Sequence, residues 1–119
     1  MSILIGCSGW SYDDWVGRFY PIEMAKERGT WFHYYAQFFS TVEINSTYYR
    51  IPGDHTVKGW IKKASGVEGF EYSVKLPRLI THDSMVRGEL ETSARQARSF
   101  EDLCIAPLAS AGCLGTGLI

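Results

Sequence analysis

Hydrophobic and polar positions alternate in three short stretches of the chain, and this period of two predicts three β-strands. The stretches cover residues 3–8, 41–45 and 70–75. A fourth strand is expected over residues 112–119, although the glycines inside it are unfavourable for a strand.

Between the strands, apolar residues recur every three or four positions, which predicts three helices. The first is expected over residues 31–39, with the Thr30 hydroxyl as its N-cap. Asp54 or Thr56 can cap the second helix, and Pro107 is expected to end the third. The expected buried stripes are Trp31, Tyr34, Tyr35 and Phe38; Val57, Trp60, Ile61 and Ala64; and Leu90, Ala94, Ala97, Phe100, Leu103 and Cys104.

Strands and helices therefore alternate along the chain, and this order is typical of α/β proteins with a parallel sheet. An open doubly wound sheet and a (β/α) barrel both fit the order. The turn after the first strand reads GCSGWSYDDW. It lacks the G-x-G-x-x-G pattern that leads directly into a helix in dinucleotide-binding folds, so we do not expect that class.

The polar positions of the strands share one face of the predicted sheet. Side chains alternate across a strand, so Val42 and Ile44 lie opposite Glu43. In a barrel the polar face points inward, and parallel α/β folds bind ligands at the carboxyl ends of their strands. The side chains expected to converge near this end are Ser8, Glu43, Asn45, Ser73 and Lys75.

Glu43 needs a partner if it is buried, because an isolated carboxylate is strongly disfavoured in a low-dielectric interior. Lys75 on the neighbouring strand is the expected partner. Two interpretations stay open. The two residues form a structural ion pair inside the barrel, or Glu43 is a general base that Lys75 modulates or complements by anchoring an anionic group.

Aromatic residues follow the first two strands at the same end of the sheet. Trp10 and Tyr12 form either a stacking platform for a sugar or a base, or part of a plug that packs on the barrel. Tyr48 and Tyr49 follow the second strand. We expect one of them to lean over the site and at least one to pack on the helix layer.

Basic residues follow the third strand. Lys75 and Arg78 together suit a phosphate or a carboxylate, and His82 is a candidate proton carrier. Alternatively, Arg78 pairs with a surface acid, and His82 takes part in hydrogen bonds within its loop. The candidate catalytic residues are thus Glu43, Lys75 and His82.

Composition narrows the class of protein. The chain has 119 residues, a net charge of −1 and 21% charged residues, as expected for a single globular domain over residues 1–119. This balance does not favour a membrane-surface or nucleic-acid binder. Three cysteines without a C-x-x-C pair indicate neither a disulfide framework nor a zinc site, and we expect no metal and no cofactor. No signal or membrane-spanning segment is visible, so a cytoplasmic location is expected.

Three motifs resemble those of a known family. GCSGWSYDDWVGRFYP, VEINSTYYRIP and FEYSVKLPRLITH occur in the order and spacing of the YecE-like family, also called domain of unknown function 72. The resemblance runs from about Ile3 to the end of the chain and implies a TIM-type (β/α) barrel, but no particular reaction. The positions that match the family motifs are Gly6, Ser8, Gly9, Trp10, Tyr12, Trp15, Gly17, Phe19, Tyr20, Pro21, Glu43, Asn45, Thr47, Tyr49, Pro52, Lys75, Arg78, Thr81 and His82.

The length of the chain differs from that of a complete barrel, which has eight strands and about 250 residues. The 119 residues correspond to an N-terminal half-barrel of about four parallel strands and three helices. Open sheet edges and an unclosed interior lead us to expect self-association or low stability when this half is expressed alone.

The motifs, the composition and the length of the chain are compatible with three functions. They do not decide whether the protein is an enzyme. The first is binding of a small polar or anionic ligand, sugar-like or phosphorylated, at the carboxyl ends of the strands. The expected ligand-binding residues are Ser8, Trp10, Tyr12, Asn45, Tyr48, Tyr49 and Arg78. The alternatives are a nucleic-acid-binding module and an inactive truncated gene product.

Overall fold

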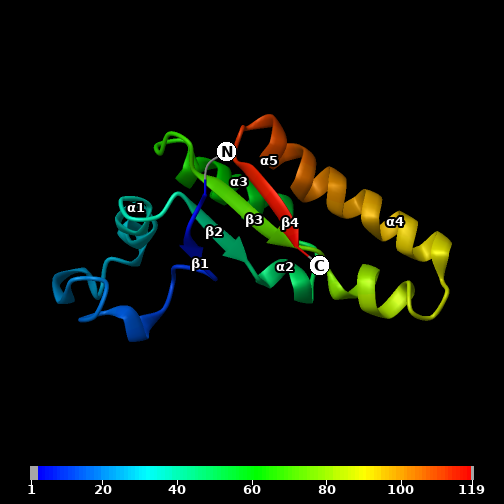
Figure 1. The fold of residues 1–119 in the computed structure, drawn as a ribbon, viewed down its shortest axis with the longest axis horizontal. Coiled ribbons are helices and arrows are strands. Elements are labelled where there is room, and N and C mark those ends of the chain that lie inside the picture. The colour runs from blue at the N-terminus through cyan, green and yellow to red at the C-terminus, as the bar shows by residue number, and fades with distance from the viewer. Residues whose placement is uncertain (1–2, 119) are drawn as a thin grey trace.

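Four parallel strands form one sheet in the computed structural model, which describes residues 3–118. They are β1 (Gly6–Cys7), β2 (Thr41–Ile44), β3 (Glu71–Lys75) and β4 (Leu114–Leu118). Their spatial order, β1-β2-β3-β4, is also their order along the chain (Figure 1). The predicted α/β fold with a parallel sheet is confirmed, while Ile119, the last residue of the predicted fourth strand, lies outside the described residues.

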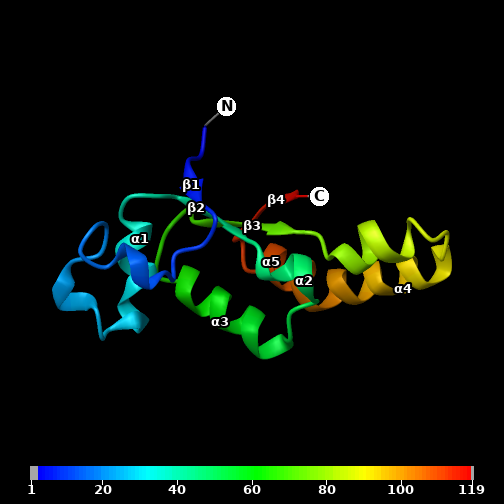
Figure 2. The ribbon, with the colours of Figure 1, turned by 90° about the horizontal axis from the view of Figure 1, so that it is seen from below.

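The helices lie on one side of this sheet. They are α1 (Trp31–Ala36), α2 (Ser46–Tyr49), α3 (Asp54–Ala64), α4 (Leu90–Phe100) and α5 (Ala106–Ser110). In Figure 2 they lie level with or below the sheet, while β1 and β4 rise from its two sides. The sheet is therefore curved, with its helices on the convex side. More helices form than the three predicted, because α2 precedes α3 and the last connection is divided.

Alternation along β2 and β3 separates an apolar face from a polar one, as predicted. Val42, Tyr72 and Val74 are fully buried beneath the helices. Glu43, Ser73 and Lys75, at the intervening positions, are half-buried on the other face. Burial on the helix side removes large apolar side chains from water, which is the main favourable contribution to folding.

The helix α1 ends earlier than the apolar spacing predicts. It stops at Ala36, so Phe38 lies beyond the helix and is 59% exposed, whereas Phe32 is fully buried. Thr30 holds the N-cap position as predicted, but its hydroxyl donates to the Glu27 carbonyl and does not accept from an N–H of the helix. The predicted caps of α3 are wrong, since the helix begins at Asp54 and Gly53 holds the cap position.

The connection from β3 to β4 is more irregular than the single helix predicted. A π-helical segment, Leu79–Ser84, precedes α4, and a second one, Glu101–Ile105, separates α4 from α5. Pro107 does not end the helix, because it lies in the first turn of α5, where its missing N–H is tolerated. The buried face also differs: Phe100 and Cys104 are buried as expected, but the predicted stripe is otherwise exposed at Leu90, Ala94, Ala97 and Leu103.

The strand β1 is shorter than the six residues predicted. Only Gly6 and Cys7 pair with β2, and Ile3 and Ile5 are exposed instead of packing under helices. The Tyr35 phenol lies between the two strands: its oxygen accepts from the Cys7 N–H at 2.7 Å and donates to the Thr41 carbonyl at 2.8 Å. A side chain of α1 thus supplies part of the hydrogen bonding that joins β1 to β2.

Replacing Tyr35 with phenylalanine is expected to lower the free energy of unfolding by about 1–3 kcal/mol. The Cys7 N–H and the Thr41 carbonyl would each lose this partner, while the buried ring would remain. Urea unfolding followed by circular dichroism measures the loss. Unchanged stability would show that the phenol does not hold β1.

The same phenol is expected to make the fold sensitive to alkali. Burial raises the pKa of Tyr35 from 10 to about 12. The unfolded chain therefore releases this proton near pH 10 while the folded chain retains it, so the stabilisation is complete below pH 10 and is lost towards pH 12. Stability should be lower at about pH 11 than at about pH 9. This difference should be smaller in Tyr35→Phe.

Candidate functional site

Glu43 and Lys75 lie on the polar face of adjacent strands. Glu43 pairs in register with Ser73, so Lys75 is two residues, or roughly 7 Å, further along β3. No ion pair joins Glu43 to Lys75 within residues 3–118. The predicted Glu43–Lys75 ion pair is therefore wrong for this structure. Both residues are half-buried on the polar face.

Lys75 contacts an aromatic ring instead of a carboxylate. Its Nζ lies 4.5 Å from the centroid of the Tyr48 ring, a distance at which the ammonium is attracted by the ring face. The His82 ring lies 5.6 Å from the same ring. The structure therefore brings Tyr48, Lys75 and His82 together at the carboxyl ends of β2 and β3.

Thr47 positions this group of residues, and the sequence did not single it out for this role. Thr47 is fully buried in α2, and its Oγ1 lies 2.5 Å from the Lys75 carbonyl and 3.1 Å from the Ile44 carbonyl. The hydroxyl therefore ties the end of β2 to the end of β3. A small polar residue three positions after the end of β2 was the available signal, but the sequence did not show that Thr47 would face inward.

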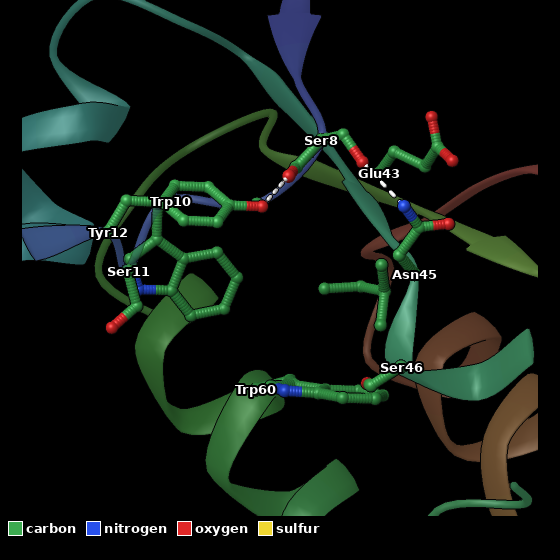
Figure 3. Close-up of a pocket in the computed structure, with 10 residues that line it drawn as sticks. Ser8, Trp10, Ser11, Tyr12, Glu43, Asn45, Ser46 and Trp60 are labelled. Carbon is green, nitrogen blue, oxygen red and sulfur yellow. Dashed lines mark hydrogen bonds between the residues drawn. The ribbon is translucent and has the colours of Figure 1, made fainter. Parts of the chain in front are cut away.

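Ser8 and Asn45 meet at the ends of the first two strands. The Asn45 Nδ2 donates to the Ser8 Oγ at 2.9 Å, and both residues are exposed (Figure 3). The amide oxygen of Asn45 stays available as an acceptor. Asn45 follows Ile44 directly, so this exposed polar pair lies beside Glu43.

Arg78 and Tyr49 lie outside this group. The Arg78 Nη2 is 3.5 Å from the Asp83 Oδ1, which agrees with pairing to a surface acid. The Tyr49 ring lies 5.3 Å from that of Tyr48 in a T-shaped arrangement, but Tyr49 is 71% exposed. The Nδ1 of His82 lies 2.6 Å from the Thr81 Oγ1, a contact within its own segment.

A cleft of about 230 Å³ lies between the loop after β1 and α3, and Ser8, Glu43 and Asn45 contribute to its lining. Trp10, Tyr12 and Trp60 contribute aromatic side chains to its lining. The Tyr12 hydroxyl donates to the Ser8 carbonyl. In Figure 3 the Glu43 carboxylate points away from Trp10 and Trp60, although Glu43 also lines the cleft.

Trp10 packs into the core rather than over the polar face. Its ring lies 5.1 Å from that of Phe32 and 6.5 Å from that of Tyr72, and both of these residues are buried on the helix side of the sheet. This placement favours the packing interpretation of the loop for Trp10. Trp60 also lines the cleft, but its spacing in the sequence is that of a core residue of α3 and gave no sign of this position.

The described residues contain no group of three or more histidine, cysteine, aspartate or glutamate side chains that could hold a metal ion. In the same part of the chain, no helix is long and apolar enough to cross a membrane. The cysteines Cys7, Cys104 and Cys113 are free, and burial raises the pKa of the Cys104 thiol to about 12, so it stays protonated near neutral pH.

Curved parallel strands, helices on the convex side and polar side chains at the carboxyl ends define an α/β protein of the TIM-barrel type, in partial form. Residues 4–119 match the family described as "Protein of unknown function DUF72". The chain belongs to this family, as its motifs indicated. No curated protein matches the chain significantly.

Two solved structures of this family are similar to the chain. A DUF72 family protein from Enterococcus faecalis V583 has 25% sequence identity and a TM-score of 0.66, and the match covers 95% of this chain and 37% of that one. A DUF72 family protein from Thermotoga maritima MSB8 has 27% identity and a TM-score of 0.65, with 96% and 42% covered. The chain therefore spans less than half the length of these two proteins.

Proposed function

We propose that this protein binds a small polar ligand on the polar face at the carboxyl ends of β1, β2 and β3. One observation carries the proposal: Glu43 and Lys75 are half-buried on adjacent strands without a carboxylate–ammonium contact between them. The Lys75 ammonium contacts the Tyr48 ring rather than a carboxylate, so its hydrogen-bond donors remain available to a ligand. A ligand that donates to Glu43 and accepts from Lys75 would bridge the two charges.

Glu43 and Lys75 favour different chemical groups of a ligand. The Glu43 carboxylate accepts hydrogen bonds, and the neighbouring Asn45 offers a further amide oxygen, so this end suits hydroxyl groups. The Lys75 ammonium suits an anionic group. A sugar phosphate presents hydroxyl groups and an anion a few ångströms apart, and we propose this ligand class. Arg78 is paired with Asp83, so the site lacks the basic cluster typical of nucleic-acid binding.

Thermal unfolding in the presence of sugar phosphates, the same sugars without phosphate, and inorganic phosphate tests the proposal. Sugar phosphates should stabilise most, since a ligand at 100 times its Kd adds about 2.7 kcal/mol. Glu43→Gln should weaken the response to both sugar classes, and Lys75→Met should abolish the advantage of the phosphate. Glu91→Gln, on the exposed first turn of α4, removes a carboxylate elsewhere and should respond like the unmodified chain. Full stabilisation in both site variants would contradict the proposal.

A further inference from the structure

The cleft beside the carboxyl ends of β1 and β2 is only partly used by the sugar-phosphate site. All of its lining residues lie between positions 8 and 60, in the loop after β1, at the end of β2 and in α2 and α3. Its volume of about 230 Å³ is below the roughly 300–1,000 Å³ of pockets for drug-sized ligands. A closed apolar cavity of about 150 Å³ already holds benzene. The cleft therefore has the size for one ring system of a larger ligand.

Two tryptophans border this cleft, and the core holds both of them in place. Trp60 is only 8% exposed, and its ring lies 6.1 Å from that of Tyr72. Trp10 is half-buried, and its ring lies 5.1 Å from that of Phe32 in a T-shaped arrangement. Figure 3 shows Trp10 and Trp60 on different sides of the cleft. Aromatic surfaces that are already fixed favour stacking with a flat ring, because they lose little conformational freedom when it binds.

Polar groups accompany the aromatic rings in the cleft. Ser11 and Ser46 are exposed and line it, and each hydroxyl can donate or accept a hydrogen bond. Among the described residues, Glu43 is the one charged side chain of the lining, and its carboxylate points away from Trp10 and Trp60 (Figure 3). A neutral ring with nitrogen or oxygen atoms at its edge suits this combination better than a hydrocarbon ring or a charged group.

The cleft is continuous with the polar face, because Ser8, Glu43 and Asn45 also line it. Lys75 lies on the next strand, two residues beyond the register partner of Glu43. From β1 to β3 the surface thus offers aromatic rings, then hydrogen-bond acceptors, then an ammonium group. A nucleoside monophosphate carries a flat base, sugar hydroxyl groups and an anionic group in the same order.

We propose that the ligand is a nucleoside monophosphate, whose base stacks against Trp10 and Trp60 in the cleft. Its ribose hydroxyl groups bind at Glu43 and Asn45, and its phosphate binds at Lys75. This assignment rests on the sugar-phosphate site proposed above and adds the base to it. The cleft has room for one base, so the ligand is a single nucleotide rather than a nucleic-acid strand.

Calorimetric titration with adenosine monophosphate and with ribose 5-phosphate tests the assignment. Adenosine monophosphate should bind about 10-fold more tightly, because stacking of the base adds to the affinity, and it should quench tryptophan fluorescence. Ser46→Leu places a larger side chain in the cleft and should remove this advantage, while ribose 5-phosphate binds as before. Ser99→Leu is the matched control, since it makes the same change at an exposed position of α4 and should keep the advantage.

The outcomes separate the base in the cleft from the sugar-phosphate site. Equal affinities for the two compounds in the unmodified chain would overturn the placement of the base and leave the sugar-phosphate site standing. An advantage of adenosine monophosphate that persists in Ser46→Leu would overturn this placement as well. Absence of binding for both compounds would contradict the sugar-phosphate site itself, and the nucleotide assignment with it.

Discussion

Replacing Tyr72 with alanine is expected to lower the free energy of unfolding by about 3–5 kcal/mol. Tyr72 is fully buried near the start of β3, and its ring lies 5.4 Å from that of Phe70, 6.0 Å from that of Phe32 and 6.1 Å from that of Trp60. It therefore joins the sheet to α1 and α3 at once. Urea unfolding followed by far-ultraviolet circular dichroism measures the loss.

The phenylalanine variant separates packing from hydrogen bonding at this position. The Tyr72 hydroxyl donates to the Trp60 carbonyl at 2.8 Å. Tyr72→Phe removes this bond but keeps the ring, so we expect a loss of only about 1 kcal/mol. An alanine variant that loses no more stability than the phenylalanine variant would show that the Tyr72 ring is not central to the core.

The substitution Gly6→Ala is expected to detach β1 from β2 and to lower the free energy of unfolding by about 3 kcal/mol. A Cβ at Gly6 would lie 2.0 Å from the Thr41 carbonyl oxygen, so one of the two backbones must move. Movement of β1 would also break the contact between Ser8 and Asn45. Urea unfolding gives the stability, and ligand-dependent thermal unfolding shows whether the site survives.

Gly59→Ala is the matched control for this substitution. A Cβ at Gly59 would meet no atom within 4 Å, and the residue lies inside α3. Alanine is favoured over glycine in a helix interior, so this variant should gain about 0.5–1 kcal/mol. Equal effects of the two substitutions would contradict the close approach of β1 to β2.

The order of elements and the faces of β2 and β3 could be predicted because they depend on local periodicity. Val42, Tyr72 and Val74 alternate with polar residues at a period of two, and burial on one side of a sheet requires this period. The same reasoning placed Glu43 and Lys75 on one face. Strand pairing then follows from chain order, because sequential strands in parallel α/β folds tend to be neighbours.

Helix ends and side-chain partners were less predictable, because they depend on tertiary contacts. Phe38 matched the spacing of a buried residue, but α1 ends before it. Pro107 predicted a helix end, but a π-helical segment places it in a new first turn. Lys75 has a long flexible side chain, and strand register does not show that it contacts Tyr48 rather than Glu43. Trp10 was ambiguous because sequence does not show on which side of the sheet a loop packs.

Nuclear magnetic resonance offers the most direct test of the proposed binding site. A sugar phosphate would be titrated into the isotope-labelled chain while amide resonances are followed. The largest changes should involve Ser8, Glu43, Asn45 and Lys75, which lie at the carboxyl ends of β1, β2 and β3. Changes confined to the helix side around Trp10 and Trp60, or no change at saturating ligand, would contradict a ligand site on the polar face.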